Sequence, residues 1–344
     1  MAQPSETTVL VTGASGFIGL HCVRELLQQG YRVRGTVRSP AREPTLRAAL
    51  EKQTDTGRLQ LATADLTSDE GWSEAVRGCR YIWHVASPVP QGPPKHEDEL
   101  IIPARDGTLR VLRAALEMGV ERVVLTSSLS AVMEGYPRDP SRIFNEEDWS
   151  RLDGDLSAYD KSKTLAERAA WDFVEGLAPD QSLELTTINP GLVLGPVLEQ
   201  DYGVSTEAIL KLMRRDFPGC PRLGWPTVDV RDVAIAHFGA MTTPEANGKR
   251  FCCSGDFVWM KEMAAILNAN FGDRGYRVPT RTLPDFVVRF VGLFDKLVRV
   301  TTPRLGLELH VSNDRIKHVL GWQPRNAEET IVDTAESLID LGLV

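Results

Sequence analysis

Short apolar runs and stretches of helical spacing alternate along the first half of the chain. Residues 7–12 form a β-rich run, and apolar side chains then recur at helical spacing over 17–28. Further apolar runs that are typical of strands follow at 31–37, 59–64, 81–86 and 122–128. Strands that alternate with helices in this way predict an α/β fold of the Rossmann type, with a doubly wound parallel sheet.

The turn between the first strand and the first helix carries three glycines in the spacing Gly-x-x-Gly-x-x-Gly. The first allows a tight turn, the second lets the backbone approach a pyrophosphate at the helix N-terminus, and the third permits close packing of helix on strand. We therefore expect a dinucleotide cofactor at this turn. The contacts are predicted to come from Gly13, Ser15, Gly16, Phe17, Ile18 and Gly19.

The end of the second strand indicates which dinucleotide binds. NAD sites normally have an acidic residue near this point that accepts hydrogen bonds from the adenosine ribose, whereas NADP sites have a basic one. This strand ends without an acid, and Arg38 lies 19 residues after Gly19. We predict that Arg38 binds the 2′-phosphate of NADP(H). We also expect Asp65 and Leu66 at the adenine edge, and Val85, Ala86 and Ser87 beside the cofactor.

Residues suited to acid–base chemistry follow further along the chain. Ser128 ends the fifth apolar run, at the carboxyl end of a strand, where parallel sheets bind ligands. A helix is expected to begin after Ser157, with Tyr159 and Lys163 one turn apart on one face. A free phenol has a pKa of about 10, and a nearby ammonium lowers the pKa toward neutrality. We predict that Tyr159 donates a proton to a carbonyl oxygen. Lys163 would tune Tyr159 and hold the nicotinamide ribose, and Ser128 would orient the carbonyl.

These motifs resemble those of the extended short-chain dehydrogenase/reductase family, in the branch of dihydroflavonol 4-reductase, cinnamoyl-CoA reductase and aldehyde or ketone reductases. The resemblance covers nearly the whole chain and includes residues 84–88, 145–149, 188–191, 228–234 and 320–322. It implies that Ser128, Tyr159 and Lys163 are the catalytic triad and that the cofactor is NADPH or NADP⁺. The same resemblance implies cofactor contacts from Thr126, Pro190, Leu192 and Val193.

The match to any single activity is looser. Where plant flavonoid reductases have an amide side chain five residues after the catalytic serine, this chain has Met133. It also lacks the Asn-Trp-Tyr-Cys-Tyr stretch of cinnamoyl-CoA reductases. We therefore expect a broader reductase of aromatic or hydrophobic aldehydes and ketones. The residues expected to line the substrate pocket, some of them equally compatible with core packing, are Pro88, Val89, Leu129, Ser130, Met133, Ile209, Met213 and Trp225.

Other functions remain open at this point. A hydroxysteroid dehydrogenase or a sugar-nucleotide epimerase is compatible with the same scaffold. Epimerases generally hold NAD, which Arg38 and the missing acid argue against. A different class of function is a regulator that senses NADP(H) without catalysis. Such a protein would be expected to have lost Tyr159 or Lys163, and both are present.

The length of 344 residues allows a nucleotide-binding domain and a smaller lobe. We expect residues 1–195 to form the NADP-binding Rossmann domain, with later segments returning to it, and residues 196–344 to form mainly the substrate-binding lobe. Residues 283–298 predict one strongly apolar helix with Phe286, Phe290, Phe294 and Leu297 on one side. We expect this helix to pack on the lobe; a contact with a membrane surface or a second copy is the alternative.

Charge and composition narrow the classes of partner. A net charge of −8 with dispersed basic residues argues against nucleic acid, and no apolar run is long enough to span a bilayer. The five cysteines and six histidines show no metal-ligand spacing. We therefore expect a cytoplasmic protein, monomeric or homodimeric, that acts on a small-molecule carbonyl compound without a metal ion or membrane insertion.

Overall fold

A seven-stranded parallel sheet forms the centre of the computed structural model, which describes residues 3–88 and 94–344. The strand order is β10-β7-β5-β4-β1-β2-β3, and all neighbours run parallel. The order reverses between β1 and β4, the kind of position at which doubly wound sheets bind ligands. The predicted Rossmann-type fold is confirmed. The strands are β1 (Thr8–Thr12), β2 (Arg32–Val37), β3 (Leu59–Thr63), β4 (Tyr81–His84), β5 (Arg122–Thr126), β7 (Glu184–Pro190) and β10 (Arg250–Cys253).

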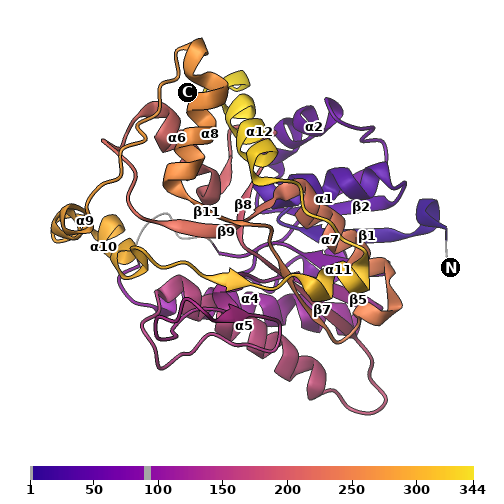
Figure 1. Ribbon diagram of the computed structural model, residues 1–344. Coiled ribbons are helices and arrows are strands. Elements are labelled where there is room, and N and C mark those ends of the chain that lie inside the picture. Colours follow the sequence, from indigo (N-terminus) through magenta and orange to yellow (C-terminus); the bar gives the residue numbers. More distant parts are fainter. Residues whose placement is uncertain (1–2, 89–93) are drawn as a thin grey trace.

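Helices cover both faces of this sheet (Figure 1). On β1, Val9 and Val11 belong to the core shared with α1 and α7, whereas Leu10 belongs to the core shared with α4 and α5. Because both faces are buried, the strands appear in the sequence as continuous apolar runs. The helices around the sheet are α1 (Phe17–Gln28), α2 (Glu43–Glu51), α3 (Trp72–Val76), α4 (Asp98–Glu117), α5 (Ala158–Glu175) and α7 (Val230–Thr242).

A smaller three-stranded sheet of order β11-β9-β8 lies beside the large one. Helices α6, α8 and α12 pack around one another next to it (Figure 1). A separate short pair, β6 with β12, ties residues before α5 to the C-terminal region. The elements are β6 (Ile143–Phe144), β8 (Leu192–Leu194), α6 (Gly203–Arg214), β9 (Gly224–Asp229), β11 (Phe257–Trp259), α8 (Met260–Phe271), β12 (His310–Val311), α11 (Asp314–Leu320) and α12 (Ala327–Asp340).

The chain crosses between the two sheets more than once. β8 ends at Leu194 and belongs to the small sheet, although it precedes the expected boundary at residue 195. β10 follows that boundary and is an edge strand of the large sheet, while α7 packs on α1. The predicted domain boundary, with residues 1–195 in one domain, residues 196–344 mainly in the other, and later segments returning to the first, therefore stays a prediction.

The segment 283–298 differs from its prediction. It forms two short helices, α9 (Asp285–Val291) and α10 (Lys296–Thr301), instead of one. Arg299 donates hydrogen bonds to the carbonyl oxygens of Gly292 (2.8 Å) and Leu293 (2.6 Å), which fixes the turn between them. The first helix does pack on the lobe, as expected, but not through the phenylalanine side. Val288 of α9 contacts the protein, and the phenylalanines on the other side of the helix are exposed.

The burial of β10 in the main core predicts a large contribution of its side chains to stability. Phe251 of β10 is fully buried, so we expect Phe251→Ala to lower the free energy of unfolding by about 3–5 kcal/mol. Phe286→Ala is the matched control, because this side chain is 73% exposed and its loss should change stability by no more than about 0.5 kcal/mol. Urea unfolding followed by fluorescence and circular dichroism gives both values. Equal effects of the two substitutions would contradict the assignment of β10 to the core.

Candidate active site

The glycine turn after β1 is shaped by backbone sterics. Gly13 has a φ of +66°, a left-handed conformation that glycine adopts without strain. A Cβ on Gly19 would lie 2.1 Å from the carbonyl oxygen of Gly13, so only glycine lets α1 approach the turn this closely. The amide of Gly13 donates to Thr36 Oγ1 (3.1 Å) and that of Ala14 to the Thr36 carbonyl (3.0 Å). These contacts fasten the turn to the end of β2.

The N-terminus of α1 suits an anion. Gly16 is its N-cap, so no side chain accepts a hydrogen bond from the first amides of the helix. The first turn also contains no acidic residue. Free amides and the positive end of the helix dipole therefore remain for a ligand such as a diphosphate. The predicted Ser15, Phe17 and Ile18 lie in this turn, and the Phe17 ring packs on His21 in the core.

The expected adenosine end lies where β2 and β3 finish side by side. Arg38 directly follows β2 and is exposed, and no ion pair to it is found within residues 3–88 and 94–344. The neighbouring Arg42 is instead paired with Glu199. Asp65 accepts hydrogen bonds from the amide (2.8 Å) and hydroxyl (2.7 Å) of Thr67, which lowers the pKa of its carboxyl. Arg38 is therefore the cation at this edge that is available to a phosphate.

The start of α5 fixes the direction of the tyrosine and the lysine. Ser157 is the N-cap, as predicted: its Oγ accepts from the amide of Asp160 (3.2 Å), whose carboxylate accepts from the Ser157 amide (3.1 Å). Tyr159 and Lys163 follow one turn apart, with Lys163 Nζ 5.8 Å from the centre of the Tyr159 ring. The side chain of Ser128, just beyond β5, lies close enough to the phenol of Tyr159 to lower its pKa. The three predicted residues are thus gathered at the carboxyl edge of the sheet.

Burial sets the ionisation of this group. It raises the pKa of Tyr159 to about 12, helped by Asp160 and opposed by the side chain of Ser128. The lowered pKa predicted from the nearby ammonium is therefore wrong in direction, because desolvation of the phenolate has the largest effect. Burial also lowers the pKa of Lys163 to about 8, and the carboxylate of Glu167 opposes this shift. At neutral pH Tyr159 is protonated and Lys163 is mostly an ammonium.

A buried network around Glu167 supports the site, and our sequence analysis missed it. Glu167 is one turn beyond Lys163 and forms an ion pair with Arg250 of β10 (2.6 Å). It also accepts hydrogen bonds from Ser127 (2.5 Å) and Asn189 (2.7 Å). Asn189 donates in turn to the carbonyl oxygen of Ser128 (3.2 Å). One feature of the sequence could have indicated Glu167: it lies four residues after Lys163, so both side chains share one helical face.

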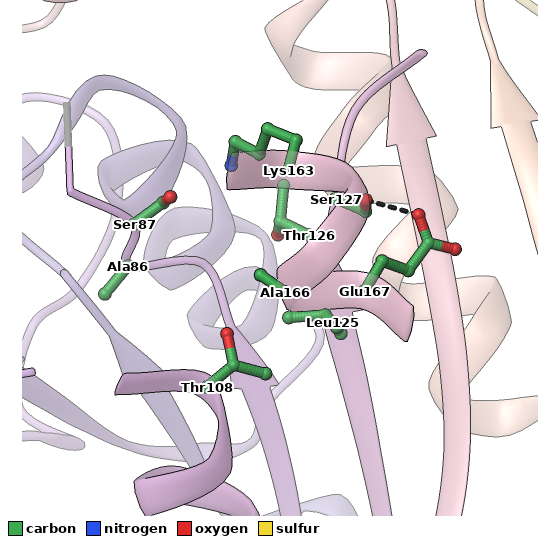
Figure 2. A pocket seen from close by; sticks show the side chains of 9 residues that line it. All are labelled: Ala86, Ser87, Thr108, Leu125, Thr126, Ser127, Lys163, Ala166 and Glu167. Atoms are coloured by element: carbon green, nitrogen blue, oxygen red, sulfur yellow. Dashed lines mark hydrogen bonds between the residues drawn. The ribbon is translucent and has the colours of Figure 1, made fainter. Parts of the chain in front are cut away.

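A narrow pocket joins this network to the predicted cofactor residues (Figure 2). It lies between β4, β5, α4 and α5, and the hydrogen bond from Ser127 to Glu167 closes one side. Thr126 lines the pocket, although its hydroxyl also bonds to His237 (2.7 Å) in the core. The lining residues are Ala86, Ser87, Thr108, Leu125, Thr126, Ser127, Lys163, Ala166 and Glu167.

The other predicted positions are more dispersed. Pro190 ends β7, and Leu192 and Val193 lie in β8 at the junction of the two sheets. Leu66 follows β3 and packs near Gly107 of α4, while Val85 packs against the main core. Whether any of these residues contacts a cofactor stays a prediction.

The residues predicted to line the substrate pocket lie in several different clusters. Ile209 and Met213 are buried in the main core, and Trp225 packs between that core and a small cluster under α9. Leu129 and Met133 belong to a third cluster beside Ser128, and Ser130 is buried there too. Pro88 is half-buried, and Val89 lies outside the described residues. Their role in substrate binding stays a prediction.

A larger cavity of about 480 Å³ was not foreseen. Its volume is in the range of small-molecule sites. Met133 is the one predicted pocket residue that lines it within the described chain. The remaining walls come from parts of residues 134–155 and 303–309, including Tyr136 and four arginines: Arg138, Arg142, Arg151 and Arg304. Arg304 is ion-paired with Glu134, whose pKa burial raises to about 7.

The electrostatic role assigned to Glu167 can be tested by titration. Glu167→Gln removes the charge that raises the pKa of Lys163, so Lys163 should become a neutral, reactive amine at lower pH than in the wild type. Amine labelling at a series of pH values, followed by peptide mass spectrometry, measures this midpoint, with Lys161 in the same helix as internal reference. Glu167→Asp keeps the charge and serves as the control. An unchanged midpoint in Glu167→Gln would contradict the assignment.

Known proteins share this fold. Residues 9–253 match the model of the NAD dependent epimerase/dehydratase family. The chain is 35% identical to cinnamoyl-CoA reductase 1 of Petunia hybrida, over 99% of this chain and 95% of the relative. It is 33% identical to tetraketide alpha-pyrone reductase 1 of Arabidopsis thaliana, over 97% and 96%. The crystal structure of yeast methylglyoxal/isovaleraldehyde reductase Gre2 complexed with NADPH has a TM-score of 0.81 at 30% identity, covering 98% of this chain and 100% of that one. The protein therefore belongs to the NAD dependent epimerase/dehydratase family, within the extended short-chain dehydrogenase/reductases.

Proposed function

We propose that the protein is an NADPH-dependent carbonyl reductase that converts an aldehyde or ketone to the alcohol. The observation that carries this proposal is the group of Ser128, Tyr159 and Lys163 at the sheet edge that also bears the glycine turn. The named activities of the relatives support it, because cinnamoyl-CoA, tetraketide pyrone and methylglyoxal reductases all act on carbonyl compounds.

The residues of the glycine turn fit NADP(H). The uncapped N-terminus of α1 suits the pyrophosphate. A side chain on Gly19 would collide with the Gly13 carbonyl, so glycine is required there for the turn to keep its shape. Arg38 would hold the 2′-phosphate, and the relative Gre2 is described in complex with NADPH. When bound, NADPH supplies the hydride that reduces the carbonyl carbon.

The chain's own residues handle the proton. With a pKa of about 12, Tyr159 carries its proton at neutral pH and can donate it to the oxygen of the reduced carbonyl. Ser128, whose side chain lies close to this phenol, is placed to orient the same oxygen. Lys163 would stabilise the phenolate that donation leaves and hold the ribose hydroxyls of the cofactor. The Glu167 carboxylate raises the pKa of Lys163 and so favours the charged form of the lysine.

The substrate is proposed to be an aromatic or hydrophobic small molecule. Met133 near the serine offers a thioether where flavonoid reductases have an amide, so this position contributes apolar contact in place of a hydrogen bond. The activities named for the relatives differ in substrate, which agrees with a pocket whose shape decides specificity.

The cellular compartment and the oligomeric state of the enzyme are also proposals. No helix within the described residues is long and apolar enough to cross a membrane. The five cysteines are free and buried, which fits a reducing compartment such as the cytoplasm. We propose a cytoplasmic monomer or homodimer.

Removal of one hydroxyl tests the proton donor. Tyr159→Phe should lower kcat for carbonyl reduction by at least about 10²-fold, because general acid catalysis of this size is lost. The dissociation constant of NADPH, measured by fluorescence titration, should stay nearly the same. Tyr81→Phe is the control, since its phenol bonds to Glu121 (3.2 Å) at the amino end of the strands, away from the site. Residual turnover of more than a few per cent in Tyr159→Phe would overturn the role.

The cofactor preference is tested at Arg38. Arg38→Gln should raise the Michaelis constant for NADPH by about tenfold or more, since a charge-assisted contact to phosphate is lost. The constant for NADH should remain unchanged, because NADH has no 2′-phosphate. Arg289→Gln, another exposed arginine on the distant α9, is the matched control. An equal rise of the Michaelis constant for NADPH and NADH would show that Arg38 does not bind the 2′-phosphate.

A further inference from the structure

Exposed apolar side chains are concentrated on α9, α10 and the turn between them. Of ten large hydrophobic side chains exposed within the described residues, six lie in this one stretch. Phe294 is 79% exposed, Phe286 73% and Phe290 61%. Single exposed apolar residues are ordinary, but a cluster of this kind marks an interaction site. We name it the apolar patch; its members are Phe286, Phe290, Val291, Leu293, Phe294 and Val300.

The patch is held in place from beneath. Val288, on the opposite side of α9, packs with Leu223 and Leu305 in a small buried cluster. The hydrogen bonds from Arg299 to the carbonyls of Gly292 and Leu293 fix the turn that links the two helices. The rings of Phe290 and Phe294 meet edge to face, with their centres 5.4 Å apart. The protein thus uses one side of α9 for its own packing and presents the other side to its surroundings.

Positive charge surrounds the patch. Arg289, Lys296 and Arg299 alternate with the apolar residues. The acids of the same segment are Asp285 and Asp295, and Asp285 is neutralised by a two-bond ion pair with Arg222 (2.5 and 3.0 Å). Counting Arg222, the region has four cations and two acids, a positive excess in a chain whose net charge is −8. Aromatic residues flanked by Lys and Arg are the composition of segments that lie on anionic membranes.

We propose that the apolar patch docks the protein on the surface of a bilayer containing anionic lipids. The phenylalanines would enter the boundary between headgroups and acyl chains, and the three cations would contact the headgroups. A second copy of the chain fits less well, because an interface of the patch with itself would gather the positive excess of both copies in one place. The contact is peripheral, because no described helix can cross a membrane. It does not depend on the proposed reduction.

Vesicle co-sedimentation tests the docking. The full-length protein should pellet with vesicles of phosphatidylcholine and phosphatidylserine, and much less with phosphatidylcholine alone. Binding should weaken as salt is raised, because the charges are exposed to screening. The double variant Phe290→Ser/Phe294→Ser should bind at least about tenfold more weakly, since two large apolar side chains no longer leave water. Arg289→Gln/Lys296→Gln should remove most of the preference for phosphatidylserine.

The matched control is Val204→Ser/Ile235→Ser, which changes two exposed apolar residues outside the patch and should bind like the wild type. Melting temperatures of all variants establish that they are folded. Failure of the wild type to pellet with anionic vesicles at low salt would overturn the proposal, as would equal binding by Phe290→Ser/Phe294→Ser. Sedimentation velocity gives the remaining outcome. A wild-type dimer that this double variant converts to monomer would assign the patch to self-association and overturn membrane docking.

Discussion

The buried ion pair of Glu167 and Arg250 is the interaction on which the site most depends. The Glu167 carboxylate is fully buried and binds Ser127, which directly follows β5, as well as groups from β7 and β10. The guanidinium of Arg250 lies 3.7 Å from the Trp149 ring and donates to the carbonyl oxygens of Glu146 and Asp148. Removal of one partner from such a pair costs about 3–5 kcal/mol, because a buried charge remains uncompensated. The pair therefore couples the last strand of the sheet to the helix that carries Tyr159 and Lys163.

The same pair links stability to chemistry. Burial alone would favour a neutral Lys163, and the Glu167 carboxylate offsets part of this effect. Tyr159 is held protonated by burial, while the side chain of Ser128 opposes the shift. The site thus holds a proton donor and a cation close together at neutral pH. At the other end, the amides of α1 and the exposed Arg38 offer positive potential to phosphates. One sheet edge supplies both ends because parallel strands all finish there.

Much of this arrangement was readable from the sequence, for physical reasons. The strands could be predicted because both faces of the sheet are buried. The start of α5 could be predicted at Ser157 because a capping box joins residues only three positions apart. The Gly13 turn was recognisable because its conformation restricts the residue type. Over 283–298 the single predicted helix is wrong, because the turn between α9 and α10 is fixed by hydrogen bonds that periodicity does not show. Periodicity also shows a stripe of phenylalanines but not which side of the helix the protein covers. The Glu167 network was missed because it joins residues up to 83 positions apart. The raised pKa of Tyr159 depends on desolvation, which spacing along a helix does not reveal.

The central claim is that this edge of the sheet catalyses NADPH-dependent reduction of a carbonyl compound. The most direct test follows nicotinamide absorbance while the purified protein is offered aromatic aldehydes, aryl ketones, a dihydroflavonol, a hydroxycinnamoyl thioester and a ketosteroid. We predict oxidation of NADPH with at least one of them, faster than oxidation of NADH. Tight binding of NADPH without turnover of any compound would contradict the account and favour a cofactor-sensing protein.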